Sequence, residues 1–170
     1  MKNPPEEIDI EPILTIAKGK RADTKAFFRW IKRKKPKNLD EAVGELHHEV
    51  FADFDCLTCG NCCKTTSPVF TDKDIDRIAK HERMKPSQFV DQYLHLDEEG
   101  DYVLNESPCH FLAADNYCLI YDVRPKACRE YPHTNRKRFR QVLGLTEKNA
   151  ELCPATHKIV ERLKEEMDWS

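Results

Sequence analysis

The sequence predicts an α+β protein, a mostly helical small domain with short irregular hairpins organised around a cysteine-ligated metal centre. Apolar residues at helical spacing recur near both ends of the chain. Turn residues separate short apolar runs in its middle. Eight cysteines form an ordered series. These observations predict an N-terminal helical extension at residues 1–50 and a cysteine-cluster metal-binding domain at residues 51–170.

The extension is expected to begin with a weakly ordered segment, residues 1–22, because prolines interrupt it at positions 4, 5 and 12. Asp23 can cap a helix over residues 23–35, which Pro36 would stop because proline lacks the amide donor that a helix interior needs. This part of the chain is therefore expected to contribute one well-defined helix before Pro36.

A second helix is expected after that proline. Asn38, with Glu41 three residues later, resembles a capping box, in which the two side chains satisfy amides of the first helical turn. Apolar residues then recur at helical spacing up to about Phe51. The second helix is expected to lead the chain into the first group of cysteines.

The middle of the chain is expected to combine two short helices with a hairpin. Thr71 with Asp74 predicts a helix start, and that helix would run to about Arg83. Pro86 fits the first position of the next helix, where its missing amide donor costs nothing. An acidic turn within residues 94–104 predicts two short strands.

The last third is expected to carry a second hairpin and two helices. Residues 109–112 and 117–120 are predicted to pair around a turn. Pro125 would open a short helix that holds Cys128, and a final helix would follow Pro154.

Composition limits the classes of function. The formal net charge of −2 argues against a general nucleic-acid role. The charged N-terminus does not resemble a secretory signal, and no apolar run approaches the roughly 18 residues that span a bilayer. We therefore expect a cytoplasmic protein with no transmembrane segment. In a reducing cytosol its thiols are expected to bind metal, although eight cysteines could also form four disulfides in a secreted protein.

Four cysteines lie within eight residues: Cys56, Cys59, Cys62 and Cys63. Two residues between cysteines let the backbone curl so that both sulfurs face one cation. Gly60 follows Cys59 and permits the positive φ that such a tight turn often needs. Adjacent cysteines in an extended chain point to opposite faces, so Cys62 and Cys63 are expected to serve two centres, or one of them ligates while the other packs or reacts.

The remaining cysteines complete the predicted ligand set of Cys56, Cys59, Cys62, Cys63, Cys109, Cys118, Cys128 and Cys153. The second group can converge through a hairpin and one helical turn. Eight thiolates can serve two four-sulfur sites, or one site with spare cysteines. The spacing of the cysteines in the first group resembles that of bacterial ferredoxins and favours a [4Fe–4S] iron–sulfur cluster. The tight turn from Cys56 to Cys59, followed by a glycine, instead favours zinc or a single iron ion.

Three blocks of sequence resemble the bacterial CxxCxxCC cysteine-cluster family, with its YkgJ-like zinc- or iron-chelating domain. They are residues 54–63 (FDCLTCGNCC), 108–112 (PCHFL) and 118–132 (CLIYDVRPKACREYP). The resemblance implies a metal-chelating domain over roughly residues 54–154. A similar domain occurs in bacterial flagellin lysine N-methylases, so the resemblance leaves a metal-containing, methylase-like enzyme as an alternative. An enzyme with Cys63 as a reactive thiol is a second form of that alternative.

Two basic runs raise a third class of function, a binding module for nucleic acid or an anionic membrane surface. Residues 25–37 contain seven Lys or Arg residues and no acid, and a second positive run lies at residues 136–140. Together with Phe27, Phe28 and Trp30, the first run could contact phosphates or lipid headgroups. A solvated helix face with the aromatic side chains packed inward is the alternative.

Overall fold

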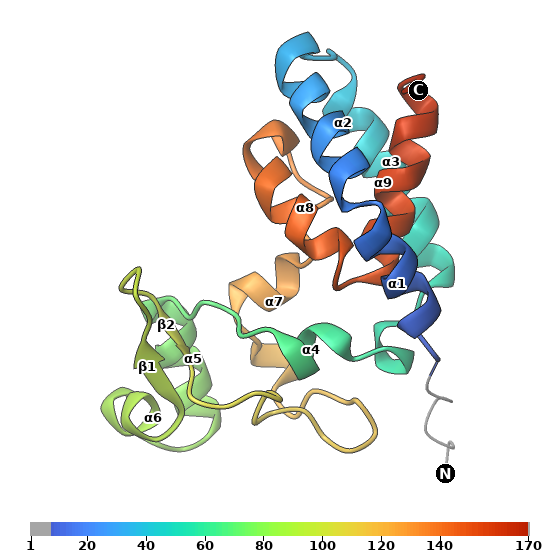
Figure 1. Cartoon of the computed structure of the whole chain (residues 1–170). Coiled ribbons are helices and arrows are strands. Elements are labelled where there is room, and N and C mark those ends of the chain that lie inside the picture. The colour runs from blue at the N-terminus through green and yellow to red at the C-terminus, as the bar shows by residue number, and fades with distance from the viewer. Residues whose placement is uncertain (1–7, 170) are drawn as a thin grey trace. The chain divides into compact units, whose positions relative to one another are not determined.

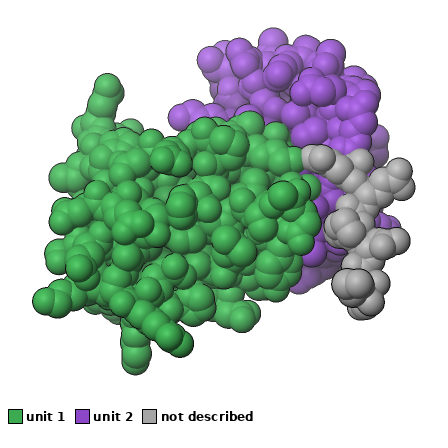
Figure 2. All heavy atoms as spheres, turned by 90° about the horizontal axis from the view of Figure 1, so that it is seen from below, with its two compact units in different colours: residues 1–7, 60–131 green, residues 8–59, 132–170 purple. Residues whose placement is uncertain are grey.

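The computed structural model describes residues 8–169 and is 60% helical, with a two-stranded antiparallel sheet (Figure 1). The predicted α+β, mostly helical class is confirmed. The described residues form two compact units, which Figure 2 distinguishes by colour. Unit 1 contains Gly60–Tyr131, and unit 2 contains Ile8–Cys59 together with residues 132–169. No helix within the described part of the chain is both long and apolar enough to cross a membrane.

Unit 2 is helical. Its elements are α1 (Glu11–Gly19), α2 (Arg21–Lys34), α3 (Leu39–Asp53), η1 (Cys56–Thr58), η3 (Phe139–Val142), α8 (Leu143–Ala150) and α9 (Pro154–Glu166). Helix α9 packs against α3 and α8, and α2 packs against α8. Their buried side chains include Phe27, Ile31, Val43, Leu46, Phe139, Leu143, Ile159 and Leu163. The start and the end of the sequence therefore share one hydrophobic core.

The helical boundaries of unit 2 correct three predictions. Residues 11–19 form α1 although weak order was expected, because Pro12 lies in the first helical turn, where its missing amide donor is not needed. The two earlier prolines lie outside the described residues. Helix α2 begins at Arg21 rather than at an Asp23 cap, and Asn38 precedes α3 without a side-chain cap hydrogen bond. The predicted capping box is therefore wrong, although the helix that it marked is present.

Unit 1 combines short helices with the small sheet. Its elements are α4 (Asn61–Thr65), α5 (Asp72–His81), α6 (Pro86–Tyr93), β1 (Leu94–Leu96), β2 (Tyr102–Leu104), η2 (Tyr121–Val123) and α7 (Lys126–Glu130). One apolar cluster fills its interior: Phe70, Ile75, Ile78, Ala79, Phe89, Leu94, Leu104, Phe111 and Ile120. Cys109 and Cys118 pack against that cluster. The core of unit 1 thus borders two of the predicted ligands.

Most of the predicted elements of unit 1 are confirmed. The capping box of Thr71 and Asp74 opens α5, Pro86 opens α6, and Leu94 pairs with Leu104 in the hairpin. The second hairpin is reduced to an isolated bridge between residues 112 and 118. Residues 109–120 still form a turn that reverses the chain, but without strands long enough to count as a sheet.

A buried lysine joins α2 to α9 within unit 2. Lys164 is 5% exposed, and its Nζ donates to Asp23 Oδ2 and Glu161 Oε1, both at 2.6 Å, and to Thr24 Oγ1 at 3.1 Å. The hydrogen bond from Lys164 holds the pKa of Asp23 below its ordinary value. A buried ammonium group is stable only where such acceptors surround it.

We predict that Lys164→Ala lowers the free energy of unfolding by about 2 kcal/mol, the usual contribution of hydrogen bonds to a charged group. Urea unfolding followed by circular dichroism measures this loss. Lys158→Ala, which removes an exposed lysine from the same helix, is the control and should change the free energy by less than about 0.5 kcal/mol. Equal losses in both variants would contradict a special contribution of Lys164.

Candidate metal centre in unit 1

Cys62 and Cys63 lie on α4, which begins directly after Gly60. Gly60 has a φ of 58°, as predicted, and a Cβ at this position would lie 2.9 Å from Asn116 Oδ1. The two sulfur atoms lie 4.0 Å apart. The expectation of opposite faces is wrong because it assumed an extended chain, and in a helix adjacent residues are only partly turned from one another. The two thiols therefore lie side by side.

Cys109 and Cys118 come from the chain reversal at residues 109–120. The Cys109 amide donates to the Cys63 carbonyl at 2.8 Å, which ties this segment to α4. Burial raises the pKa of Cys109 and Cys118, and the backbone amides of Phe111 at the first and of Ile120 at the second act to lower it. Amide donors of this kind stabilise a charged sulfur, so the backbone here favours thiolates.

Cys128 lies on α7, and a buried carboxylate fixes the start of that helix. Asp74 Oδ1 accepts from the Lys126 amide at 3.1 Å and from Arg77 Nη2 at 2.6 Å. The same guanidinium donates to the Arg124 carbonyl at 2.9 Å. Asp74 and Arg77 thus connect α5 to the segment that carries Cys128. The sequence showed Asp74 only as part of a capping box, and nothing in its pattern indicated the role of Arg77.

Four thiols gather from these three segments: Cys63, Cys109, Cys118 and Cys128. Every pair among them is close enough for its charges to interact. Unit 1 therefore brings together predicted ligands that are up to 65 positions apart in sequence.

Burial and mutual repulsion oppose ionisation of these thiols. Burial raises the pKa of Cys109 to about 11 and that of Cys128 to about 12, and the charges of the neighbouring cysteines act in the same direction. Burial also raises the pKa of Cys118. By contrast, a hydrogen bond with Cys62 lowers the pKa of Cys63 to about 7. A bound cation is the usual compensation for several thiolates at such close range.

Arg124 provides a positive charge beside this cluster. Burial raises the pKa of both Cys118 and Cys128, and the charge of Arg124 partly opposes that rise. Its guanidinium carbon lies 3.8 Å from the centre of the Tyr121 ring, and its Nη1 donates to the Tyr121 carbonyl at 2.8 Å. Within residues 8–169 it forms no ion pair.

The other three predicted ligands belong to unit 2. Cys56 is exposed and Cys59 is buried, and both border η1. Cys153 is 8% exposed, and its sulfur accepts from the Thr156 amide at 3.5 Å as the cap of α9. All eight cysteines fall within the described residues, and among these residues no disulfide is formed. The disulfide alternative therefore does not describe this structure.

Four of the five thiols of unit 1, those of Cys63, Cys109, Cys118 and Cys128, approach one another without forming a closed coordination shell. Within residues 8–169, no three Cys, His, Asp or Glu side chains are arranged, as they stand, to hold a metal ion. The donor set nevertheless suits a thiophilic metal: four sulfurs satisfy tetrahedral zinc, mononuclear iron or a [4Fe–4S] cluster. Side-chain rotations on a backbone that is already converged would have to complete the shell.

Comparison with known proteins agrees with this chemistry. Residues 55–154 match the CxxCxxCC family, described as a putative zinc- or iron-chelating domain. The match covers more than half of the chain, so the protein belongs to this family, as the three cysteine-containing blocks indicated. Family membership supports metal binding in general. No curated protein and no solved structure matches the chain.

Gly60 provides a first prediction for this centre. Gly60→Ala should reduce the stability of unit 1 for two reasons. The left-handed backbone conformation costs an alanine about 1–2 kcal/mol, and the added Cβ would come into close contact with Asn116. Gly100→Ala is the matched control, since Gly100 also has a positive φ, of 84°, but no atom lies within 4 Å of its Cβ position. Urea unfolding should show the larger loss for Gly60→Ala, and an equal loss would contradict the close contact.

Asp74 provides a second prediction. Burial by itself would raise the pKa of Asp74, but hydrogen bonds from Thr71, Arg77 and the Lys126 amide outweigh it and hold the pKa below 3.8. We expect Asp74→Asn to lower the free energy of unfolding by about 2 kcal/mol at neutral pH, because it weakens hydrogen bonds to a charged acceptor. Hydrogen exchange at α7 should become faster in this variant.

The pH dependence follows from the direction of that pKa. A carboxyl group whose folded pKa is depressed stabilises the fold fully above its unfolded value, near 3.8, and loses this contribution as the pH falls through the lower folded value. Unfolding of the native chain and of Asp74→Asn, measured between neutral and acidic pH, should therefore converge below that value. A stability difference that stays constant on acidification would contradict a charged Asp74.

Proposed function

We propose that the protein is a metal-binding protein whose thiolates in unit 1 hold zinc or iron. The ligands would be Cys63, Cys109, Cys118 and Cys128. The observation that carries the proposal is the convergence of these four thiols from α4, the 109–120 segment and α7, inside a family described by zinc or iron chelation. Neighbouring thiols gain little from one another without a metal, whereas a shared cation attracts all four.

A structural contribution of the metal is supported by the small size of unit 1. Its 60–131 segment has short helices, a two-stranded sheet and one apolar cluster. Domains of this size bury little apolar surface, and metal binding that occurs only in the folded state adds directly to the free energy of unfolding. The metal would join α4 to α7, two helices of five residues each that are too short to be stable alone.

The choice between zinc and iron decides whether a redox role is available. A zinc site with four thiolates is closed and structural, because zinc does not change oxidation state in proteins. An iron–sulfur cluster, [4Fe–4S] among the possibilities, would add electron transfer or redox sensing. Anaerobic purification followed by elemental analysis and visible absorption spectroscopy distinguishes them: a colourless protein with stoichiometric zinc removes the iron form.

Further predictions from the sequence concern the other four cysteines, the division into domains and the location of the protein. Cys56, Cys59, Cys62 and Cys153 stay predicted ligands, of this centre or of a second one. The division into residues 1–50 and 51–170 and the cytoplasmic location also stay predictions. The N-terminal part would then serve as an addition to the metal-binding part.

We predict that serine at any of Cys63, Cys109, Cys118 or Cys128 strongly reduces the metal content of the purified protein, because each removes one of four ligands. Metal content measured by mass spectrometry, together with the urea midpoint of unit 1, tests this. Cys153→Ser is the comparison, because Cys153 is also a predicted ligand but lies in unit 2, where its sulfur accepts a helix-capping hydrogen bond. Equal metal loss in Cys153→Ser would contradict a centre confined to unit 1.

The same series tests the enzyme alternative. If Cys63 is a reactive thiol rather than a ligand, Cys63→Ser would leave the metal content unchanged and abolish rapid alkylation at that position. A ligand would instead lose metal on substitution. The two results are mutually exclusive, so this variant separates the binding function from a thiol-dependent one.

A further inference from the structure

The positive charge of the chain is concentrated in two segments of unit 2. Residues 25–37 and 133–141 contain 11 of the 28 Lys and Arg residues and no Asp or Glu. The remaining 17 basic residues stand against all 30 acidic residues. The net charge of −2 is an average over the whole chain, and these two segments form a strongly basic region within it. Such a region can attract an anionic partner such as a nucleic acid whatever the net charge of the chain.

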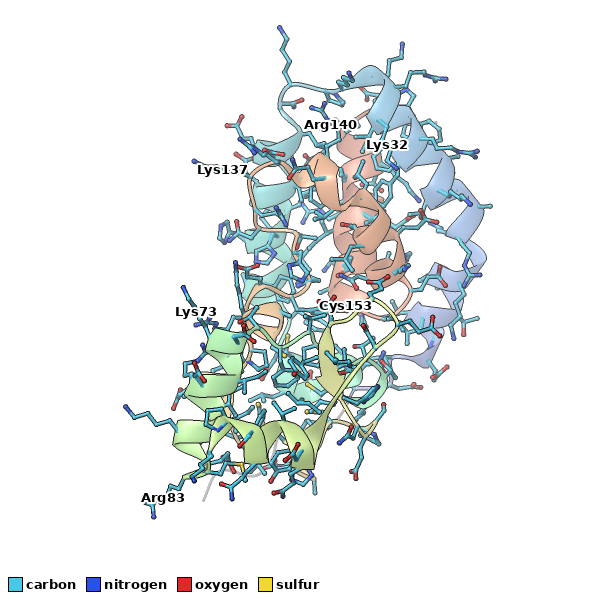
Figure 3. All side chains as sticks on the ribbon, turned by 90° about the vertical axis from the view of Figure 1, so that its left-hand side faces the viewer. Lys32, Lys73, Arg83, Lys137, Arg140 and Cys153 are labelled. Atoms are coloured by element: carbon cyan, nitrogen blue, oxygen red, sulfur yellow. The ribbon has the colours of Figure 1, made fainter. Side chains whose placement is uncertain are left out.

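The two segments meet at one end of unit 2. Lys32, near the end of α2, lies with Lys137 and Arg140 at this end in Figure 3, whereas Cys153 lies toward the other end of the unit. All 11 basic side chains of the two segments are exposed. We call this surface the basic end; it comprises Lys25, Arg29, Lys32, Arg33, Lys34, Lys35, Lys37, Arg136, Lys137, Arg138 and Arg140.

The cations of the basic end have no carboxylate partner among residues 8–169. Other basic residues of unit 2 do have such partners: Lys20 pairs with Glu161, and Arg21 pairs with Glu151. The difference is local, because both kinds of residue lie on the same helical unit. An unneutralised group of like charges gains free energy when an anion binds to it.

A cavity of about 370 Å³ lies within the basic end. Its walls come from the residues before and at the start of α3 and from the segment around η3, and they consist of Pro36, Lys37, Leu39, Asp40, Arg138, Arg140 and Gln141. This volume falls in the range of ordinary ligand sites. The cavity therefore combines concavity with three cationic side chains.

The wall that carries the two arginines is held in place. Asp40 accepts from the Arg138 amide at 2.6 Å and from the Phe139 amide at 2.9 Å, and Phe139 is 1% exposed. Arg138 has a φ of 58°, a conformation that non-glycine residues adopt at a cost and keep only where the surroundings impose it. The one carboxylate of the cavity is thus already occupied by backbone donors, and the segment is fixed before any ligand arrives.

The aromatic residues of α2 do not take part in this surface. Phe27 and Phe28 are buried, and Trp30 stacks on Phe27, so the expectation that they contact an anionic partner is wrong. None of the large apolar side chains exposed among residues 8–169 belongs to the two basic segments. The basic end therefore offers charge without an apolar anchor, which favours a phosphate chain in water over insertion into a membrane.

We propose that the basic end binds the phosphate backbone of a nucleic acid, with one phosphate in the cavity held by Lys37, Arg138 and Arg140. Arginine presents a planar fork of donors that matches phosphate oxygens. The lysines that follow one another at the end of α2 extend the positive surface beyond the cavity, so neighbouring phosphates of the same strand would contact them. Contacts to phosphate alone carry no base sequence, so binding would not depend on sequence.

The test is fluorescence anisotropy of the full-length protein with a labelled oligonucleotide of about 20 nucleotides, longer than a typical single-strand site. The double variant Lys37→Gln/Arg140→Gln removes two contacts and leaves the backbone of Arg138 intact. Counterion release predicts an affinity about 25-fold lower at 0.1 M salt and a slope of log K against log salt smaller by about 1.4. The control Lys148→Gln/Lys158→Gln removes the same charge from exposed lysines of α8 and α9 and should keep the native slope.

Each other result overturns the proposal. Absence of oligonucleotide binding, or binding that is equally weakened by both double variants, would show that the basic end is not a site. Binding to anionic lipid vesicles but not to the oligonucleotide would assign it to a membrane surface. Saturable binding of a mononucleotide that the oligonucleotide does not displace would assign the cavity to a small ligand instead.

Discussion

Repulsion among buried sulfurs is the physical constraint on which unit 1 depends. Cys63, Cys109, Cys118 and Cys128 lie close enough for every pair to interact, and burial raises the pKa of Cys109 and Cys128. Neutral thiols attract one another only weakly, and thiolates at this distance repel one another. A cation bound among the thiolates would remove that repulsion, and its binding free energy would then become folding free energy. The chemistry of these side chains therefore suits a thiophilic cation.

The backbone around the cluster reduces the remaining cost. Amides from Phe111 and Ile120 point at two of the sulfurs, and Arg124 adds a positive charge that is itself held over a tyrosine ring. Asp74 and Arg77 place the start of α7 without using any cysteine. The supporting interactions are thus made by neighbours of the proposed ligands, and metal sites in general depend on such neighbouring residues.

Signals between residues a few positions apart predicted most of the helices and strands. Contacts between residues far apart in the sequence determined which side chains lie together in the candidate site. Thr71 with Asp74 and Pro86 marked their helices correctly because capping depends on residues a few positions apart. The same reasoning failed at Asn38, whose side chain makes no cap hydrogen bond although the helix begins at the next residue. For the site, spacing predicted the cysteines as a set, but it could not show that α4 would place Cys62 beside Cys63 or that Arg77 would connect two helices across 47 positions.

Each of the two proposed sites gathers groups of like charge, negative in unit 1 and positive in unit 2. In unit 1, sulfurs that would carry negative charge are gathered, and in unit 2, exposed cations are gathered around a cavity with no carboxylate left to neutralise them. Folding does not by itself place like charges together, because each such group costs electrostatic free energy. A partner of opposite charge explains why both groups are tolerated. Because the four thiols lie in unit 1 and the exposed cations lie in unit 2, metal binding and anion binding can be tested separately, and the failure of one would leave the other unaffected.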